Sequence, residues 1–226
     1  MSLLRHNLLR VLLVCGAMDA LVLGQAGTVS IPAPGPELAF DNDYFRVLRV
    51  AVPAGEIPIH GEQSRDVVIV PIVPPAPGRD IGVIFVAKGS PPHVTPLADP
   101  YEALVIEVKK HWEAEVRSCA SPMTCTHKIT AGGLDVGETT LLFGNGFVTA
   151  YRHHLISGGT LDSSYHSTKG TNHILVVALT ELPLNVGGIE QDLRSGQVFF
   201  SDQTEAEVNA GSHAADWVVL RVLSPR

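Results

Sequence analysis

The feature that most constrains the fold of this chain is a β-strand pattern that occurs twice. An offset of 103 residues carries Phe40-Asp41-Asn42 onto Phe143-Gly144-Asn145, and a strand-like run follows each triplet. An offset of 114 residues carries Gly82–Val86 onto Gly196–Phe200 and Leu104–Val108 onto Val218–Val222. Because recurrence at a fixed spacing is typical of a copied structural unit, we expect two similar β domains in tandem, the second lengthened by an insertion.

The runs between these anchor points favour strands over helices. Short segments rich in Val, Ile and Phe alternate with turn residues, and the 226 residues include 21 Gly and 16 Pro. No segment shows a long apolar period of 3.6 residues, which an amphipathic helix would need. The fold class is therefore expected to be all-β, a sandwich or a barrel.

The charge of the chain excludes some classes of partner. The formal net charge is −7, only 17% of residues are charged, and Lys and Arg do not cluster. Nucleic acid is not expected as a partner, because neutralising phosphates requires a concentrated basic face. After the N-terminus no stretch is apolar over the roughly 18 residues that a membrane span needs, so none is expected.

Two segments outside the repeats bear on the compartment. Residues 1–26 combine a basic start, an apolar stretch and small residues, the pattern of a secretory signal peptide, and predict a secreted or periplasmic protein. Residues 27–37 are expected to form an extended lead-in. In the connector 113–137, Cys119 and Cys125 would close a small disulfide loop in an oxidising space, worth about 2 kcal/mol. A metal pair completed by His127 is the alternative.

The first repeat carries most of the residues that could do chemistry. His60 and Glu62 share one face of an extended chain, because side chains alternate in a strand. Asp66 keeps the same parity at the head of the next strand, and His93 follows later in the repeat. Two imidazoles and two carboxylates suit a divalent ion such as Mn, Fe, Ni or Zn. In the second repeat, His153 and His154 alternate faces of a strand, and a structural role is expected for them.

These residues resemble the motifs of the cupin superfamily, and the tandem pattern is similar to a bicupin. The first cupin motif runs from glycine to His-x-His and then glutamate; the second places a histidine eleven residues after a glycine. Gly55, His60, Glu62 and Asp66 fall on the first motif, and Gly82 and His93 on the second. Two positions depart from the pattern: Glu62 replaces the second histidine, and Asp66 replaces the glutamate.

The second repeat departs further from the family. His166 matches the first histidine, Thr168 takes the place of the second, and His173 that of the glutamate. Glu207 corresponds to His93, and Glu205 is the alternative residue for this position. The resemblance implies two tandem jelly-roll barrels, over residues 38–112 and 138–226. It also implies a weaker metal set of His166, His173 and Glu207, and association into a homodimer.

Two functions remain open at this stage. The first is a divalent-metal-dependent enzyme, an oxygenase, isomerase or lyase of a small organic molecule, that uses the N-terminal barrel. The second is a secreted module, structural or binding a small ligand, in which the metal motifs have degenerated. The departures from the motifs favour the second.

Overall fold

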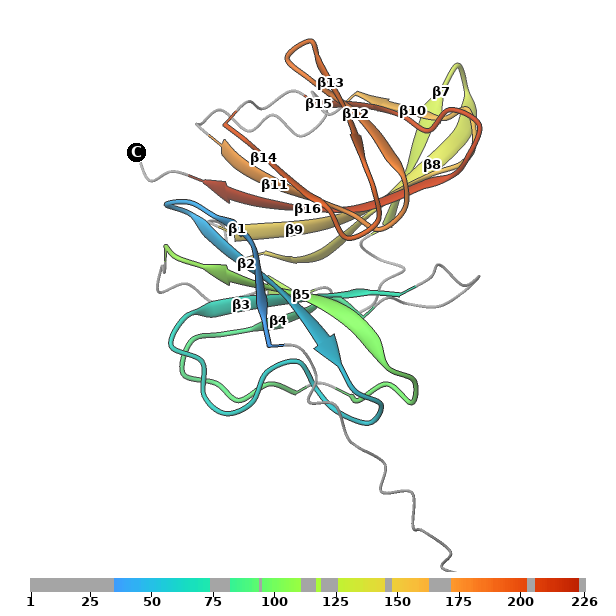
Figure 1. Ribbon diagram of the computed structural model, residues 1–226. Coiled ribbons are helices and arrows are strands. Elements are labelled where there is room, and N and C mark those ends of the chain that lie inside the picture. Colours follow the sequence, from blue (N-terminus) through green and yellow to red (C-terminus); the bar gives the residue numbers. More distant parts are fainter. Residues whose placement is uncertain are drawn as a thin grey trace, which may run out of the picture. The chain divides into compact units, whose positions relative to one another are not determined.

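The computed structural model describes residues 35–73, 82–93, 95–110, 117–118, 126–144, 148–162, 172–202 and 206–223. The described residues, all within Ala33–Arg226, belong to one compact unit. All secondary-structure elements of the described residues are strands, and none of these residues forms a helix that could cross a membrane (Figure 1). The expected signal peptide, Cys119 and Cys125 lie outside the described residues.

The first repeat forms a single antiparallel sheet, sheet A. Its strands are β1 (Glu37–Asp41), β2 (Phe45–Val52), β3 (Asp66–Ile72), β4 (Ile84–Val86) and β5 (Tyr101–Val108). They lie in the order β1-β2-β5-β3-β4. The central strand β5 pairs on both sides, which fits its nearly continuous apolar sequence.

The second repeat forms two sheets. Sheet B contains β6 (Arg117–Ser118), β7 (Thr126–Ala131), β8 (Leu134–Gly144), β9 (Val148–Leu155), β11 (Asn172–Ala178), β14 (Val198–Ser201) and β16 (Ala215–Leu223). Sheet C contains β10 (Thr160–Asp162), β12 (Leu182–Val186), β13 (Ile189–Leu193) and β15 (Ala206–Asn209). Strand β7 falls within the expected connector, residues 113–137, and pairs with β8.

The order of the strands confirms the internal duplication. In sheet B the order β8-β9-β16-β11-β14 repeats the order β1-β2-β5-β3-β4 of sheet A. The registers also agree: Phe45 pairs with Val108, and Val148, 103 residues after Phe45, pairs with Val222, 114 residues after Val108. The two sequence offsets therefore mark equivalent strands at the centre of each sheet.

The edge strands of the two sheets need a different offset. Val68 pairs with Phe85 in sheet A, and Leu175 pairs with Phe200 in sheet B. Phe85 is thus equivalent to Phe200, an offset of 115 where the sequence pattern predicted 114. A one-residue shift along a strand moves a side chain to the opposite face, so this difference decides which phenylalanine faces which layer.

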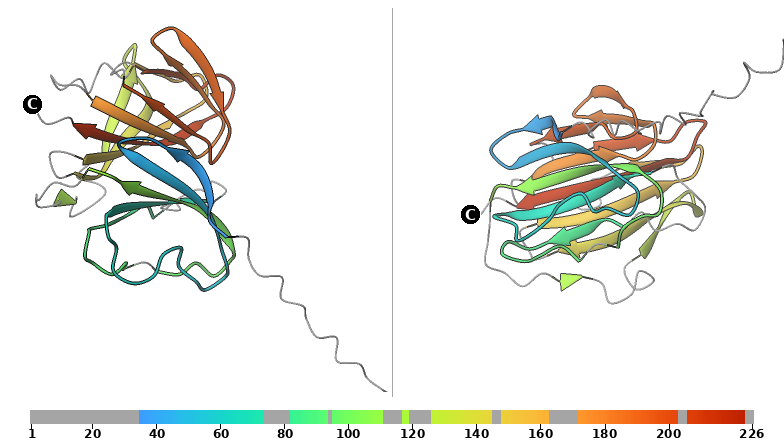
Figure 2. Two further views of the ribbon diagram at one scale, coloured as in Figure 1. Left: turned by 60° about the vertical axis from the view of Figure 1, so that its left-hand side comes forward. Right: turned by 60° about the horizontal axis from the view of Figure 1, so that its bottom comes forward.

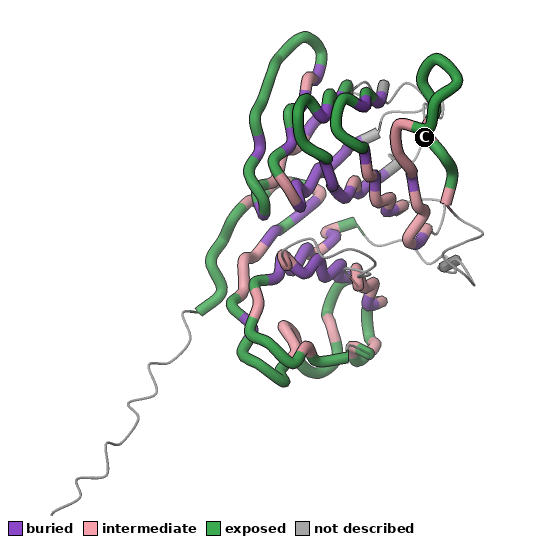
Figure 3. Tube along the Cα trace, turned by 90° about the vertical axis from the view of Figure 1, so that its right-hand side faces the viewer, coloured by how far each residue is buried: buried purple, intermediate pink, exposed green. Residues whose placement is uncertain are grey.

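Strand alternation places a separate core on each face of sheet B. One face packs against sheet A through a cluster of buried side chains that we term the central core. Its members are Phe45, Val47, Val68, Val70, Leu104, Ile106, Val108, Phe143, Val148, Ala150, Leu175, Val177, Leu179, Val218, Leu220 and Val222. The other face packs against sheet C. Figure 2 shows the layers, and Figure 3 shows the buried segments gathered on the facing strands.

The face of sheet A that points away from sheet B, its inner face, lacks such a partner. Among the described residues of the first repeat no second sheet covers it. Irregular segments, residues 53–65, 87–93 and 95–100, connect the strands in sequence. Its core is small, with six buried side chains including Val67, Ile69 and Val105. Two equivalent barrels were expected. The described residues of the second repeat form two facing sheets, whereas those of the first repeat form one sheet.

Tyr101, packed against this small core, gives a test of the burial at sheet A. Desolvation raises the pKa of its phenol above the ordinary value of 10.0. Because the folded-state pKa is the higher one, the stabilisation is complete below pH 10.0 and is lost as the pH rises through the folded pKa. We expect Tyr101→Phe to flatten the alkaline fall in unfolding free energy, measured by urea denaturation across that range. An equally steep fall in the variant would place Tyr101 in water.

Candidate functional site

The described structure does not bring the predicted metal ligands of the first repeat into one group of three or more. His60, Glu62 and His93 are exposed residues of the irregular segments. Asp66 is buried at the start of β3, where its carboxylate accepts a hydrogen bond of 2.8 Å from the backbone N–H of Lys88. By alternation Asp66 shares the face of Val68 and Val70, which points toward sheet B and away from the inner face of sheet A.

These positions do not fit a metal ion. Nowhere in the described ranges, which include all four residues, do three His, Cys, Asp or Glu side chains gather where they could hold one. Ions such as Mn²⁺ or Zn²⁺ need several converging ligands. The set of His60, Glu62, Asp66 and His93 is therefore not assembled as a metal site.

The weaker set of the second repeat is not assembled by its described members either. His166 and Glu205 lie outside the described residues. His173 points toward sheet A: its ring stacks on Tyr44 with centroids 3.6 Å apart, and its Nδ1 lies 2.5 Å from Oδ1 of Asp202. Glu207 is exposed on β15, where its neighbour Val208 turns toward sheet B. His173 and Glu207 thus belong to different sheets and face different layers.

Polar and aromatic side chains gather instead on the face of sheet B that points toward sheet C. We term Thr139, Tyr151, His153, Trp217 and Arg221 the inner-face cluster. Strand alternation explains their direction, because Leu155 and Ala215, of the same parity on β9 and β16, belong to the core between sheets B and C. In register, Thr139 pairs with His153 and His153 pairs with Trp217, which brings three strands together in one row.

His153 is at the centre of the inner-face cluster. It is 4% exposed, and its Nδ1 lies 2.9 Å from the Thr139 hydroxyl oxygen. Its ring stacks on the Trp217 indole at 5.0 Å between centroids and 24° between planes. The Tyr151 ring lies 6.2 Å away. The Thr139 hydroxyl and the Trp217 indole therefore contact the imidazole from the two strands that flank β9 and orient it.

Arg221 brings a positive charge to the same face. Burial lowers the pKa of its guanidinium, and the Tyr151 phenol acts in the opposite direction. A half-buried guanidinium, a phenol, an imidazole and an indole together offer directional hydrogen bonds and flat stacking surfaces. Small-molecule sites usually combine a largely apolar wall with a few polar groups.

The sequence pattern could have indicated this cluster. The offsets of 103 and 114 carry His153 and Arg221 back to Val50 and Glu107, two residues of one parity on paired strands. The expected structural role for His153 and His154 rested on their being neighbours on one strand, which fixes that they face opposite ways but not which face is inward. His153 is the inward one.

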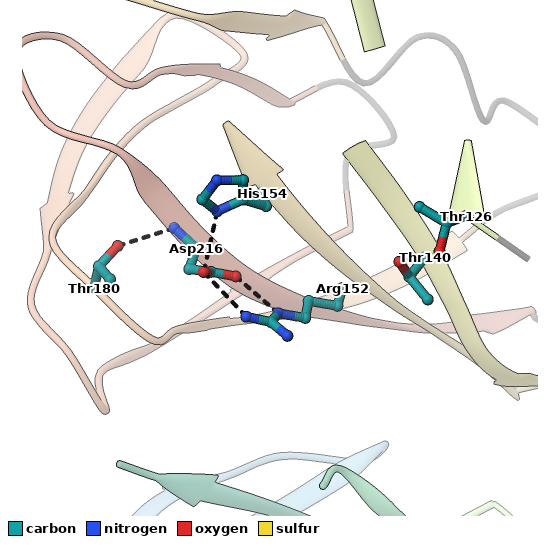
Figure 4. A network of polar contacts seen from close by, with 6 residues as sticks. All are labelled: Thr126, Thr140, Arg152, His154, Thr180 and Asp216. Atoms are coloured by element: carbon teal, nitrogen blue, oxygen red, sulfur yellow. Dashed lines mark hydrogen bonds and ion pairs between the residues drawn. The ribbon is translucent and has the colours of Figure 1, made fainter. Parts of the chain in front are cut away.

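His154 belongs to a polar network on the opposite face of sheet B (Figure 4). The buried Asp216 carboxylate accepts hydrogen bonds from Arg152 Nε at 2.9 Å and Nη2 at 3.1 Å, and lies 3.2 Å from His154 Nδ1. The backbone N–H of Asp216 donates to the Thr180 hydroxyl at 2.9 Å. The network joins β9, β16 and the turn after β11, so its role is structural.

Comparisons with known proteins find likenesses among solved structures. The sequence matches no protein-family model and no curated protein. AerE from Microcystis aeruginosa superposes with a TM-score of 0.51 and 12% identity, over 85% of this chain and 99% of AerE. The match to the cupin domain of Schizosaccharomyces pombe Cnp3 (TM-score 0.33, 13% identity) covers 39% of this chain and 65% of the Cnp3 domain. The Cupin_2 domain of an XRE-family transcriptional regulator from Enterobacter cloacae superposes with a TM-score of 0.35 and 19% identity. The match covers 41% of this chain and 100% of that domain.

Proposed function

We propose that this protein, which has the cupin fold, binds a small polar molecule at the inner-face cluster of its C-terminal repeat. The observation that carries the proposal is the buried imidazole of His153, oriented by Thr139 and Trp217 on the wall between sheets B and C. The chain would then act as a binding module, and its metal motifs would be degenerate.

The energetics of burial support a binding role for these side chains. Burying a polar group costs free energy unless it is hydrogen-bonded, and the buried His153 depends on Thr139 for such a bond. An aliphatic residue would fill a purely structural wall without that requirement. The other repeat shows that the fold tolerates them: Leu48, Val50 and Ala103 occupy the positions of Tyr151, His153 and Trp217. Polar and aromatic groups at these positions suit recognition of a ligand.

The test is a binding screen with matched histidine variants. Monosaccharides, small carboxylic acids and nucleosides would be tested for thermal stabilisation of the protein, and hits measured by calorimetry. His153→Asn should weaken binding of a hit about tenfold or more, because the imidazole ring that would stack on the ligand and hydrogen-bond to it is lost. His154→Asn, the adjacent residue on the opposite face, is the control and should bind normally. Equal binding by both variants would contradict the proposal.

Export is a further part of this proposal, supported by the pattern of residues 1–26. Material from the native host should begin after Gly24 or Ala26, as checked by N-terminal sequencing. Peptide mapping without reduction should find Cys119 joined to Cys125. A mature chain that still begins at Met1 would refute export.

A further inference from the structure

We propose a second binding site, of different chemistry, on the inner face of sheet A: it takes an amphiphilic molecule with a hydrocarbon chain and one carboxylate. This site is independent of the inner-face cluster and lies in the other repeat. Three features support it: the residues of sheet A at the positions equivalent to the cluster, the partial exposure of those residues, and the charged side chains at one end of the face.

Because the two repeats are duplicated, the inner face of sheet A can be compared position by position with the face of sheet B that points toward sheet C. At the positions of Tyr151, His153, Trp217 and Arg221, sheet A has Leu48, Val50, Ala103 and Glu107. Three of these replacements exchange a polar or aromatic side chain for a smaller aliphatic one. The inner face of sheet A is therefore suited to hydrocarbon, while sheet B is suited to polar groups.

The covering of this face leaves apolar surface in contact with water. Leu48, Val50, Ile59 and Ile84 pack against the small core but are only half-buried. The equivalent face of sheet B is covered by sheet C, and the core that these two sheets share has twelve buried residues, against six here. Removing apolar surface from water is favourable by about 25 cal/mol per Å², so a hydrocarbon chain laid on these side chains would gain free energy.

Charged side chains at one end of the same face determine which headgroup of the amphiphile would fit there. Arg46 pairs in register with Glu107, and Arg65 Nη1 lies 3.6 Å from Glu107 Oε2. Asp41, opposite Arg46 on β1, is in an ion pair with Lys109. Lys109, then Arg46 and Arg65, hold the pKa of Asp41 below its usual range, which places all three cations in one local field.

Among the charged groups that these contacts join, the balance is positive. Three cations (Arg46, Arg65 and Lys109) stand against two carboxylates (Asp41 and Glu107). One further carboxylate would neutralise it. Arginine is suited to this contact because its planar guanidinium can bind a carboxylate with two parallel hydrogen bonds. Arg46 and Arg65 are both exposed, so the headgroup can reach them from solvent.

Calorimetry with decanoate and decanol, below the concentration at which decanoate forms micelles, tests the assignment. We expect decanoate to bind and decanol to bind at least about tenfold more weakly, because the alcohol lacks the charge-assisted contact. Arg46→Gln should weaken decanoate binding by a similar factor. Arg194→Gln, an exposed arginine of the other repeat, is the matched control and should have no effect.

Two comparisons separate this site from nonspecific binding and from the C-terminal site. Val50→Asp puts a like charge on the apolar face and should abolish decanoate binding while the far-ultraviolet circular dichroism is retained. His153→Asn should leave decanoate binding unchanged, whatever it does to polar ligands. Equal affinity for decanol and decanoate, full affinity in Arg46→Gln, or loss of decanoate binding in His153→Asn would overturn the assignment.

Discussion

Replacing Leu220 by alanine should lower the free energy of unfolding by about 2–5 kcal/mol, the usual cost of a cavity in a packed core. Leu220 is fully buried in the central core. Its equivalent Ile106, 114 residues earlier on β5, is fully buried in the same core from the other sheet. Ile106→Ala should therefore cost a similar amount. Because both repeats contribute to one cluster, either substitution should shift the unfolding of the whole described unit.

Urea denaturation followed by circular dichroism and by the fluorescence of Trp112 and Trp217 checks this expectation. Both probes should report one transition, displaced to lower urea by either substitution. Leu38→Ala, at an exposed position on β1, is the control and should change the midpoint little. Two separate transitions, of which Ile106→Ala moves only one, would show that the repeats are stable independently of each other.

Removing the carboxylate of Asp216 is the second substitution with a large expected effect. Asp216→Ala should destabilise the protein by about 2–4 kcal/mol, because Arg152 and His154 lose the partner that offsets their partial burial. The side chain of Asp216 is 8% exposed and that of Arg152 is 26% exposed, so solvent screens the charge only partly.

A double-mutant cycle measures how much of that loss comes from the ion pair. Arg152→Met in the Asp216→Ala background should cost much less than Arg152→Met alone, since the partner is already absent. Asp192→Ala, at an exposed aspartate on β13, is the control for removing one negative charge. Additive losses in the double variant would mean that the contacts in Figure 4 contribute independently.

The sequence was most informative about the sheets. The offsets of 103 and 114 identified equivalent strands because copied strands keep their apolar alternation and their pairing partners. The all-β class and the tandem arrangement followed from this. The single sheet of the first repeat could not be predicted in the same way, since an irregular segment with prolines and a short strand have similar composition.

The candidate site was harder to predict because residue spacing does not fix which face of a strand is inward. Asp66 matched a cupin motif by position, yet it lies on the face toward sheet B. His153 matched no motif, yet it lies on the inner face with Trp217. One residue of register decides between these outcomes, and only the partner layers, sheet A on one side and sheet C on the other, reveal it.

The central claim is that recognition uses the inner face of sheet B and not the motif histidines of the first repeat. Imidazole signals of His60, His93 and His153, assigned by substitution and followed by NMR during titration with a hit from the polar panel, test it most directly. We expect the His153 signals to shift with saturation while those of His60 and His93 stay in place. Saturable shifts at His60 and His93 with His153 unmoved would contradict it.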